Sequence, residues 1–215
     1  MPAMSEPVPV KASQVFVIDD DAAIRSSLLS LFHSVDLQAT AFGSAAEFLS
    51  SQRPDVPSCL VLDVRLPGIG GIEFQAELAK ANIRLPIIFI TGYGDIPMTV
   101  QAMKAGAIEF LTKPFGDQDL LDAVRAGLDR DGARREREQV LLGVVSAHET
   151  LTTRERQVFA LVTTGLMNKQ VASKLGISEI TVKVHRMNAV RKMGARSLAD
   201  FVRMADLLGI QQQGT

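Results

Sequence analysis

The sequence has little of what secreted and membrane proteins need. Its 215 residues include one cysteine, Cys59, which excludes an internal disulfide and a thiolate metal cluster and agrees with a reducing compartment. The apolar runs at 85–90 and 59–62 are far shorter than the roughly 18 residues that cross a bilayer. The first residues lack the basic and apolar regions of a signal peptide. We therefore expect a cytoplasmic protein with no membrane partner.

The net charge of −1 conceals an uneven distribution of charge along the chain. Residues 1–128 carry 9 Lys and Arg against 15 Asp and Glu, whereas residues 129–215 carry 14 against 9. The acidic half can gather a cation, and the basic half can meet nucleic acid or another anionic surface. The length also favours two domains, because globular domains most often run about 100–150 residues.

Short apolar segments of strand length recur through the first half, and helical patterns follow the first four of them. These segments are 15–18, 37–42, 59–62, 86–90 and 107–111. Near-continuous apolar strands in a repeated βα unit indicate a parallel sheet that is covered on both faces. The sequence therefore predicts an α/β domain with a doubly wound, five-stranded parallel sheet over residues 12–128. Ligands of such sheets gather outside the carboxyl ends of the strands.

Residues 129–149 change abruptly to dense charge followed by a small apolar cluster, which predicts a helical linker between two domains. This linker can extend the last helix of the first domain. A solvated helix that acts only as a spacer explains the pattern at least as well as a coiled-coil dimer seam, because two heptads are too few to decide.

After residue 150 the sequence predicts helices only. Thr152 and Glu155 have the spacing of a capping box, so a helix should begin there and end before Gly165. Three further helix starts are expected at the candidate N-caps Asn168, Ser178 and Ser197. The second and third helices are separated by a tight glycine-containing turn, which is typical of a helix-turn-helix. We expect an all-α four-helix domain over residues 150–210.

Five side chains are expected at one edge of the sheet. Asp19 and Asp20 follow the first predicted strand and Asp63 follows the third, while Thr91 and Lys113 follow the fourth and fifth. Three carboxylates repel one another unless a hard cation such as Mg²⁺ neutralises them. The set suits phosphoryl transfer, in which Asp63 attacks a phosphoryl donor while Lys113 and Thr91 bind the remaining oxygens. An Asp pair after a strand is also an ordinary helix-capping signal, but capping does not explain why four strand ends carry matching chemistry.

Residues 14–128 resemble the receiver domain of two-component response regulators, which has the CheY-like fold with strand order 2-1-3-4-5. The matching segments are 15–21, 62–68, 90–92 and 110–115. The resemblance implies that a sensor histidine kinase phosphorylates Asp63. It also implies Mg²⁺ or Mn²⁺ held by Asp20, Asp63 and the backbone carbonyl of Arg65, with Asp19 reaching the metal through water.

The same resemblance implies a cis peptide bond between Lys113 and Pro114 and a switch formed by Thr91 and Phe110. The Thr91 hydroxyl would move in to bind the phosphoryl group, and the Phe110 ring would turn into the vacated space. An ordinary core role for Phe110 is the alternative, since a strand residue there would be apolar in any case. The surface that changes shape dimerises in relatives, so a homodimer is expected on phosphorylation.

Residues 150–210 resemble the NarL/LuxR-type helix-turn-helix output domain, through segments 151–158, 165–172 and 177–185. Residues 151–215 carry 10 Lys and Arg against 4 Asp and Glu, which suits binding to duplex DNA. Residues expected at phosphates are Asn168, Lys169, Thr181 and Arg191. Residues expected at base edges are Lys183, Val184 and Met187, with Arg186 or Asn188 at the rim.

Four other residues of the third helix are expected to pack within the domain and not to contact DNA. Ile180, Val182 and Val190 are expected in the core, and His185 is expected to pack against the preceding helix rather than to contact DNA. Met187 differs from relatives that have a lysine there, so their operator sequence cannot be transferred.

In segments 92–98 and 104–107, the whole chain most resembles the FixJ-like subgroup of response regulators. The resemblance implies a transcription regulator that is not an enzyme and that binds promoter DNA after phosphorylation, with RNA polymerase as a further partner. The alternative is a phosphorylated adaptor whose C-terminal domain binds protein. A haloacid-dehalogenase-type phosphatase is disfavoured because Arg65 stands where such an enzyme needs a second acid. The absence of a GxxxxGK[ST] segment excludes the ATP-driven class of transcriptional activators.

Overall fold

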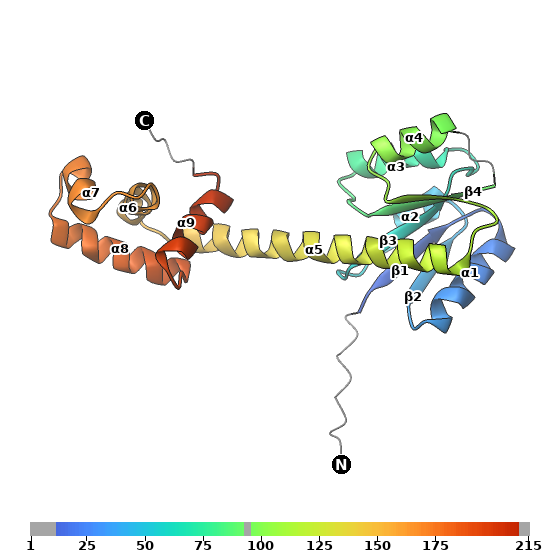
Figure 1. The fold of residues 1–215 in the computed structure, drawn as a ribbon, viewed down its shortest axis with the longest axis horizontal. Helices are drawn as coiled ribbons and strands as arrows, with labels where there is room; N and C mark the ends of the chain where they lie inside the picture. Colours follow the sequence, from blue (N-terminus) through green and yellow to red (C-terminus); the bar gives the residue numbers. More distant parts are fainter. Residues whose placement is uncertain (1–11, 93–95, 211–215) are drawn as a thin grey trace, which may run out of the picture. The chain divides into compact units, whose positions relative to one another are not determined.

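The computed structural model describes residues 12–92 and 96–210, which form five strands and nine helices (Figure 1). The chain divides into two compact units, Met1–Arg135 and Glu136–Thr215. Part of the FixJ-like segment at 92–98, namely residues 93–95, lies outside the described residues.

The N-terminal unit contains one parallel sheet with the order β2-β1-β3-β4-β5. Its strands are β1 (Gln14–Ile18), β2 (Gln38–Phe42), β3 (Ser58–Asp63), β4 (Ile87–Thr91) and β5 (Glu109–Thr112). The predicted doubly wound fold and strand order are confirmed. Asp63 and Thr91 differ slightly from expectation, because each is the last residue of its strand rather than the first residue after it.

Helices cover both faces of this sheet, and the strand residues alternate between two cores. The helices are α1 (Ala22–Ser34), α2 (Ala45–Ser50), α3 (Gly71–Lys80), α4 (Ile96–Lys104) and α5 (Asp117–Glu149). One core joins strand residues such as Phe16, Leu60 and Phe89 to α2, α3 and α4. The other joins their neighbours in the strands, such as Val17 and Ile88, to α1 and α5. This period of two is what a strand buried on both faces requires.

The single cysteine of the chain belongs to the second of these cores. Cys59 lies in β3 with no exposed surface, and burial raises the pKa of its thiol. Gly127 brings α5 close to it, since a Cβ at that glycine would lie 3.0 Å from the Cβ of Cys59. The thiol is therefore a packing group between strand and helix.

Helix α5 is continuous from Asp117 to Glu149 and includes the segment expected as a linker. Asp131 in its middle is buried and accepts a hydrogen bond from the backbone N–H of Ser58, the first residue of β3, at 3.0 Å. Arg134 and Arg135 also donate to this carboxylate at 2.6 Å, and Arg135 pairs with Asp55. The bonds to Ser58 and Asp55 fix α5 to the amino end of β3, and the two arginines neutralise the Asp131 carboxylate from within the helix. In the sequence, Asp131 is one of many charged residues in a short segment, so its burial could not be predicted.

The C-terminal unit is helical, as predicted. Its helices after α5 are α6 (Thr153–Thr163), α7 (Asn168–Leu175), α8 (Glu179–Met193) and α9 (Leu198–Leu207). The capping box of Thr152 and Glu155 is confirmed, and so are the N-caps Ser178 and Ser197. The prediction for Asn168 is wrong: Met167 is the N-cap of α7 and Asn168 is the first helical residue. The side chain of Gln170 satisfies the Met167 N–H instead, at 2.8 Å.

One apolar core holds these helices together. It joins the helix-turn-helix pair α7 and α8 to α6 and α9, and the rings of Phe159 and Phe201 meet edge to face at 4.6 Å. Val144, near the end of α5, is buried in the same core. Gly176 ends α7 with a φ of 65°, a left-handed conformation that glycine adopts without strain. Among the described residues, none of the helices has the length and apolar character needed to cross a membrane.

Candidate functional site

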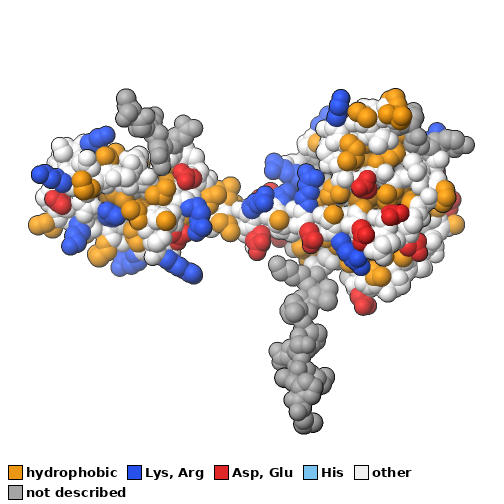
Figure 2. All heavy atoms as spheres, viewed as in Figure 1, with side chains coloured by type: hydrophobic (Ala, Val, Ile, Leu, Met, Phe, Trp, Pro, Cys, Tyr) orange, Lys and Arg blue, Asp and Glu red, His pale blue; other side chains and the backbone are white. Residues whose placement is uncertain are grey.

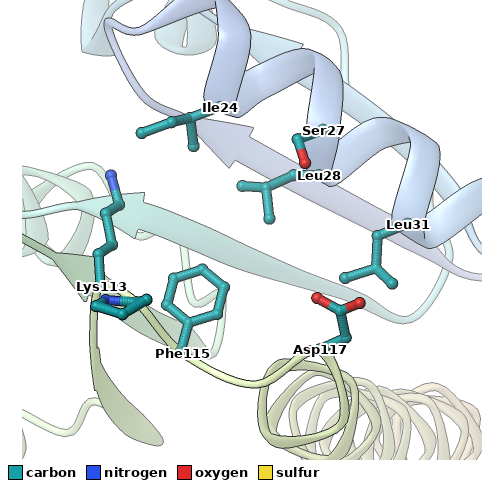
Figure 3. A pocket seen from close by; sticks show the side chains of 8 residues that line it. Ile24, Ser27, Leu28, Leu31, Lys113, Phe115 and Asp117 are labelled. Atoms are coloured by element: carbon teal, nitrogen blue, oxygen red, sulfur yellow. The ribbon is translucent and has the colours of Figure 1, made fainter.

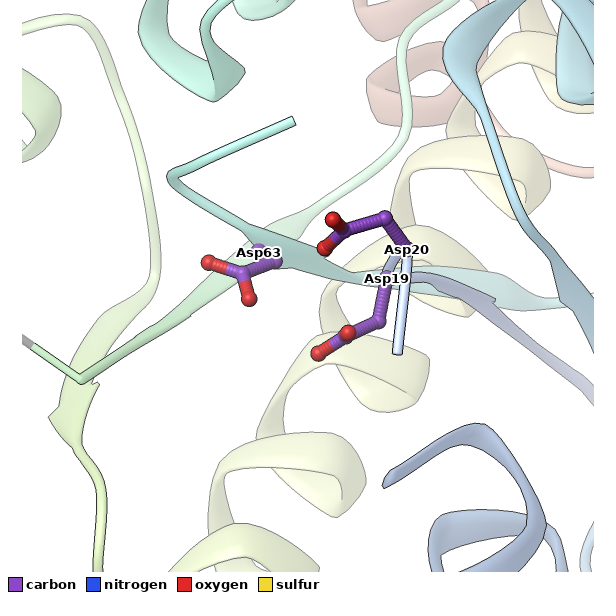
Figure 4. Close-up of side chains that lie close together, drawn as sticks. All are labelled: Asp19, Asp20 and Asp63. Carbon is purple, nitrogen blue, oxygen red and sulfur yellow. The ribbon is translucent and has the colours of Figure 1, made fainter. Parts of the chain in front are cut away.

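Three carboxylates meet at the carboxyl edge of the sheet (Figure 4). Asp19 and Asp20 follow β1, and Asp63 ends the neighbouring strand β3, so the parallel register brings them together. One oxygen from each lies within 4.8 Å of the others. Asp19 and Asp63 are buried, whereas Asp20 is exposed. The expected convergence of these side chains is therefore observed.

Lys113 supplies the positive charge at this edge. Its Nζ donates to Asp19 Oδ2 and to Asp63 Oδ2, each at 2.8 Å. Burial alone would lower the pKa of Lys113, but the bonds to both carboxylates outweigh burial and leave the pKa above its ordinary value. Burial raises the pKa of Asp19, although Lys113 opposes this shift. Three carboxylates against one ammonium leave a formal charge of −2, so the edge can hold a divalent cation.

Backbone contacts hold two of the carboxylates in position. The Asp21 N–H donates to Asp19 Oδ1 at 2.8 Å, and the Arg65 N–H donates to Asp63 Oδ1 at 3.0 Å. Nη1 of Arg25 donates to the backbone carbonyls of Asp19 and Asp20, at 2.7 and 2.9 Å. Sequence reasoning missed Arg25, because a side chain that binds carbonyls of a preceding loop leaves no residue pattern.

The start of α3 is packed tightly against the phosphoacceptor candidate. A Cβ at Gly71 would lie 2.6 Å from the carbonyl oxygen of Asp63 and 3.0 Å from Cα of Val64. The Gly71 N–H also donates to the Val64 carbonyl at 2.9 Å. Only glycine permits this approach, so Gly71 helps to set the backbone that carries Asp63.

The two switch candidates lie on adjacent strands. Thr91 is buried at the end of β4, and its carbonyl accepts from the Lys113 N–H at 2.7 Å. Phe110 in β5 is half-buried, with its ring centroid 6.2 Å from that of Phe89. The peptide bond between Lys113 and Pro114 is cis, as the resemblance implied. Thr91 and Lys113 thus reach the same edge as the carboxylates.

A hollow of about 480 Å³ lies beside this edge, between α1 and the segment that joins β5 to α5. Figure 3 shows Ile24, Leu28 and Leu31 of α1 facing Phe115, with Lys113 at one end and Asp117 at the other. The side chains that line the hollow are mostly apolar, and Lys113 is among them.

The candidate DNA contacts lie on α7 and α8. Lys169, Lys183, Val184, Met187 and Arg191 are exposed, and Thr181 is half-buried. The rim candidate Arg186 is half-buried and donates to Asn168 Oδ1 at 3.0 Å, so in this structure the two side chains bind each other across the motif. The other rim candidate, Asn188, is half-buried and accepts from Arg191 Nη2 at 3.4 Å.

The structure divides the residues of α8 that were expected in the core. Val182 is buried and Val190 packs against the core, as predicted. The prediction for Ile180 is wrong, because this side chain is exposed. Ile180 lies on the opposite face of α8 from Val182, and an apolar residue type alone does not say which face is covered. His185 is half-buried.

Sequence reasoning also missed an ion pair that joins α6 to α8. Lys192 donates to Glu155 Oε2 at 2.7 Å and to the Thr150 carbonyl at 3.1 Å. Glu155 is buried and also accepts from the Thr152 N–H at 2.8 Å. The bond to Lys192 is the main reason that the pKa of Glu155 lies below its ordinary value, with the Thr152 N–H second.

Family models match both units of the chain. The response regulator receiver domain matches residues 15–125, and the luxR family of bacterial regulatory proteins matches residues 149–205. The chain is a two-component response regulator with a luxR-type DNA-binding domain. The first match includes the acidic edge with Asp19, Asp20 and Asp63, and the second includes helices α7 and α8.

Full-length relatives agree with this assignment. Nodulation protein W of Bradyrhizobium diazoefficiens is 59% identical over 201 residues, which cover 94% of this chain and 88% of that protein. The transcriptional regulatory protein FixJ of Azorhizobium caulinodans is 45% identical over 196 residues, covering 91% and 93%. The name of the second relative describes it as a transcriptional regulatory protein.

Solved structures are also similar. The response regulator StyR matches with a TM-score of 0.82 and 48% identity, over 91% of this chain and 98% of that chain. Full-length FixJ from B. japonicum matches with a TM-score of 0.57 and 37% identity, over 94% and 100%. The FixJ-like membership expected from the sequence is therefore confirmed.

Proposed function

We propose that a sensor histidine kinase phosphorylates Asp63 and that this response regulator then binds promoter DNA as a homodimer to regulate transcription. The observation that carries the proposal is the Asp63 carboxylate at the open edge of the sheet, 2.8 Å from the Lys113 ammonium and beside two further carboxylates. An oxygen of Asp63 forms a bond to phosphorus while the bond between phosphorus and the donor breaks, and the electron pair leaves with the donor. Lys113 and the Thr91 hydroxyl then bind phosphoryl oxygens.

The residues at this edge fit Mg²⁺ or Mn²⁺. Hard cations prefer oxygen ligands, and the carboxylates of Asp19, Asp20 and Asp63 lie together here. In the site proposed by resemblance, Asp20, Asp63 and the backbone carbonyl of Arg65 would hold the cation, and Asp19 would reach it through water. Together, the three carboxylates and the Lys113 ammonium carry a formal charge of −2, which a divalent cation would neutralise. When bound, the cation neutralises charge between the carboxylates and the incoming phosphoryl group.

The phosphoryl group would change the receiver through Thr91 and Phe110. It adds a charge close to −2 and strong acceptor oxygens, which favour a state with the Thr91 hydroxyl drawn toward it. The half-buried Phe110 ring then turns into the space left behind. A coupling of about 1–3 kcal/mol is typical and is sufficient to shift the population toward a dimer.

The domain boundaries that go with this function are residues 12–128 for the receiver, 129–149 for the linker and 150–210 for the DNA-binding domain. Two copies of α8 would read half-sites about one helical turn apart. The regulator would act in the cytoplasm, with RNA polymerase as a further partner. The exposed cations of α7 and α8 favour duplex DNA over the protein partner of an adaptor.

The first test is phosphorylation of Asp63→Asn by acetyl phosphate with Mg²⁺. Wild type should gain one phosphoryl group, and the variant should gain none because its amide is not a nucleophile. Asp36→Asn is the control, since that aspartate is exposed and remote from the edge, and it should be labelled like wild type. Persistent labelling of Asp63→Asn would place the acceptor elsewhere.

The second test separates base reading from phosphate binding. Lys183→Ala should lower affinity for the selected operator by about 1–3 kcal/mol and relax the sequence preference. Lys169→Ala should weaken all duplexes alike and reduce the salt dependence. A salt-sensitive gel shift of the full chain measures both. If no duplex shifts at any salt concentration, the adaptor alternative replaces DNA binding.

A further inference from the structure

Helix α8 carries apolar side chains on two opposite faces. One face is buried in the core of the C-terminal unit through Val182, Ala189 and Met193. The other face presents Ile180, Val184 and Met187, whose exposed fractions are 77%, 46% and 61%. A surface helix needs only the first set for stability, so the second set requires a separate explanation.

The exposed set coincides with the face proposed to read bases. With about 3.6 residues per turn, positions 180, 183, 184 and 187 fall within an arc of about 100° on the helix surface. Ile180 lies near the centre of that arc, between Lys183 on one side and Val184 on the other. Ile180, which was expected in the core, therefore lies where a base-contacting residue would lie.

The chemistry of this face matches one feature of the major groove. Apolar side chains do not bind phosphates or the polar edges of guanine, but they make favourable contacts with the C5 methyl group of thymine. The face carries no acidic residue, and it also bears the exposed cations Lys183 and Arg191. Figure 2 shows Lys and Arg side chains along α8 with hydrophobic side chains among them.

We propose that Ile180, Val184 and Met187 form a thymine-reading stripe and that Ile180 is a specificity-determining residue of the operator contact. The proposal deepens the DNA-binding function proposed above and rests on it. The juxtaposition that carries it is three exposed apolar side chains on the arc of α8 that also bears Lys183, in a domain with 10 basic and 4 acidic residues over 151–215. The operator should contain thymines opposite the stripe in each half-site.

The test removes methyl groups one at a time from the DNA. An operator is first selected from random duplexes with the phosphorylated full chain. Each thymine is then replaced by deoxyuridine, which keeps base pairing and loses only the methyl group. Loss of a methyl that contacts the stripe should weaken wild-type binding about fourfold, which corresponds to about 0.8 kcal/mol.

Ile180→Ala assigns the methyl to its side chain. The variant should bind the thymine operator more weakly than wild type, and it should lose sensitivity to deoxyuridine at one thymine of each half-site while keeping it at the others. Leu207→Ala is the matched control, because Leu207 is 43% exposed on α9 and lies outside the stripe. That variant should respond to every deoxyuridine as wild type does.

The outcomes separate this proposal from the function on which it rests. Specific binding that ignores every deoxyuridine would overturn the stripe and leave DNA binding intact. An Ile180→Ala variant that changes the oligomeric state in light scattering, with an unchanged deoxyuridine profile, would mean that protein covers the stripe and would also overturn the proposal. Failure of the wild type to bind any duplex would remove the proposed function and the stripe with it.

Discussion

The ion pair between Glu155 and Lys192 offers a sharp test of how α8 is held against the rest of its domain. Glu155→Ala removes two bonds at once. The hydrogen bond from the Thr152 N–H, at 2.8 Å, is worth about 1 kcal/mol as half of a capping box. The charge-assisted bond from Lys192, at 2.7 Å, is worth about 1.5–3 kcal/mol. Lys192 is 31% exposed, so its ammonium can turn to water and no further penalty for a buried charge is expected.

The expected loss is therefore about 2.5–4 kcal/mol, which corresponds to a rise in the equilibrium constant for opening of the domain by a factor of about 70 or more. Hydrogen exchange followed by mass spectrometry on the full chain measures this loss segment by segment. Amides of α6 and α8 should exchange faster, while those of β1 and β3 should keep the wild-type rate. Glu179→Ala is the matched control, because Glu179 is exposed on the first turn of α8 and should change exchange little.

The pair also predicts a dependence on pH. The pKa of Glu155 is held below its ordinary value of 4.5, so its stabilising contribution is fully present above that value and disappears as the pH falls through the lowered pKa of the folded state. The difference in stability between wild type and Glu155→Gln should therefore be constant near neutral pH and should shrink in acid. A difference that grows in acid, or unchanged exchange in α8 of Glu155→Ala, would refute the role assigned to this pair.

Two further substitutions test the receiver. Gly71→Ala should destabilise the receiver by about 1–3 kcal/mol in urea unfolding and slow phosphorylation of Asp63 by acetyl phosphate, because the new Cβ would lie 2.6 Å from the Asp63 carbonyl oxygen. Gly143→Ala is the control, because its Cβ would meet nothing within 4 Å, and it should change neither the stability nor the rate of phosphorylation. Asp131→Asn should cost about 2 kcal/mol in urea unfolding, because a buried carboxylate that accepts from three residues is lost. The same substitution at the exposed Asp129 should be neutral, and equal effects at both positions would contradict the anchoring role of Asp131.

The parallel sheet and the acidic edge could be predicted from local patterns, whereas the strand order was implied by the resemblance to receiver domains. Asp63 ends an apolar segment, and the carboxyl ends of neighbouring parallel strands share one edge. The Thr152–Glu155 capping box could likewise be predicted from the sequence, because both of its hydrogen bonds lie within one helical turn.

What the sequence did not show depends on contacts between distant segments. Arg25 binds carbonyls of the preceding loop, and Asp131 binds a backbone N–H that lies 73 positions away. Ile180 was assigned to the core because its residue type is apolar, although α8 has two apolar faces and only packing decides which is covered. Asparagine is a common N-cap residue, which is why Asn168 was expected to cap α7. The helix instead begins at Asn168 itself, and its side chain accepts a hydrogen bond from Arg186.

The buried position of Cys59 has a practical consequence for following the conformational cycle of this protein. The thiolate is the nucleophile that attacks thiol reagents, at a rate set by its population and its access to solvent. Cys59 offers neither, because it is fully covered and its pKa is raised. A cysteine introduced at an exposed position such as Leu142 should therefore take a spin label or fluorophore selectively in the folded chain. The native thiol can stay in place, so the packing between β3 and α5 need not be disturbed to obtain a singly labelled regulator.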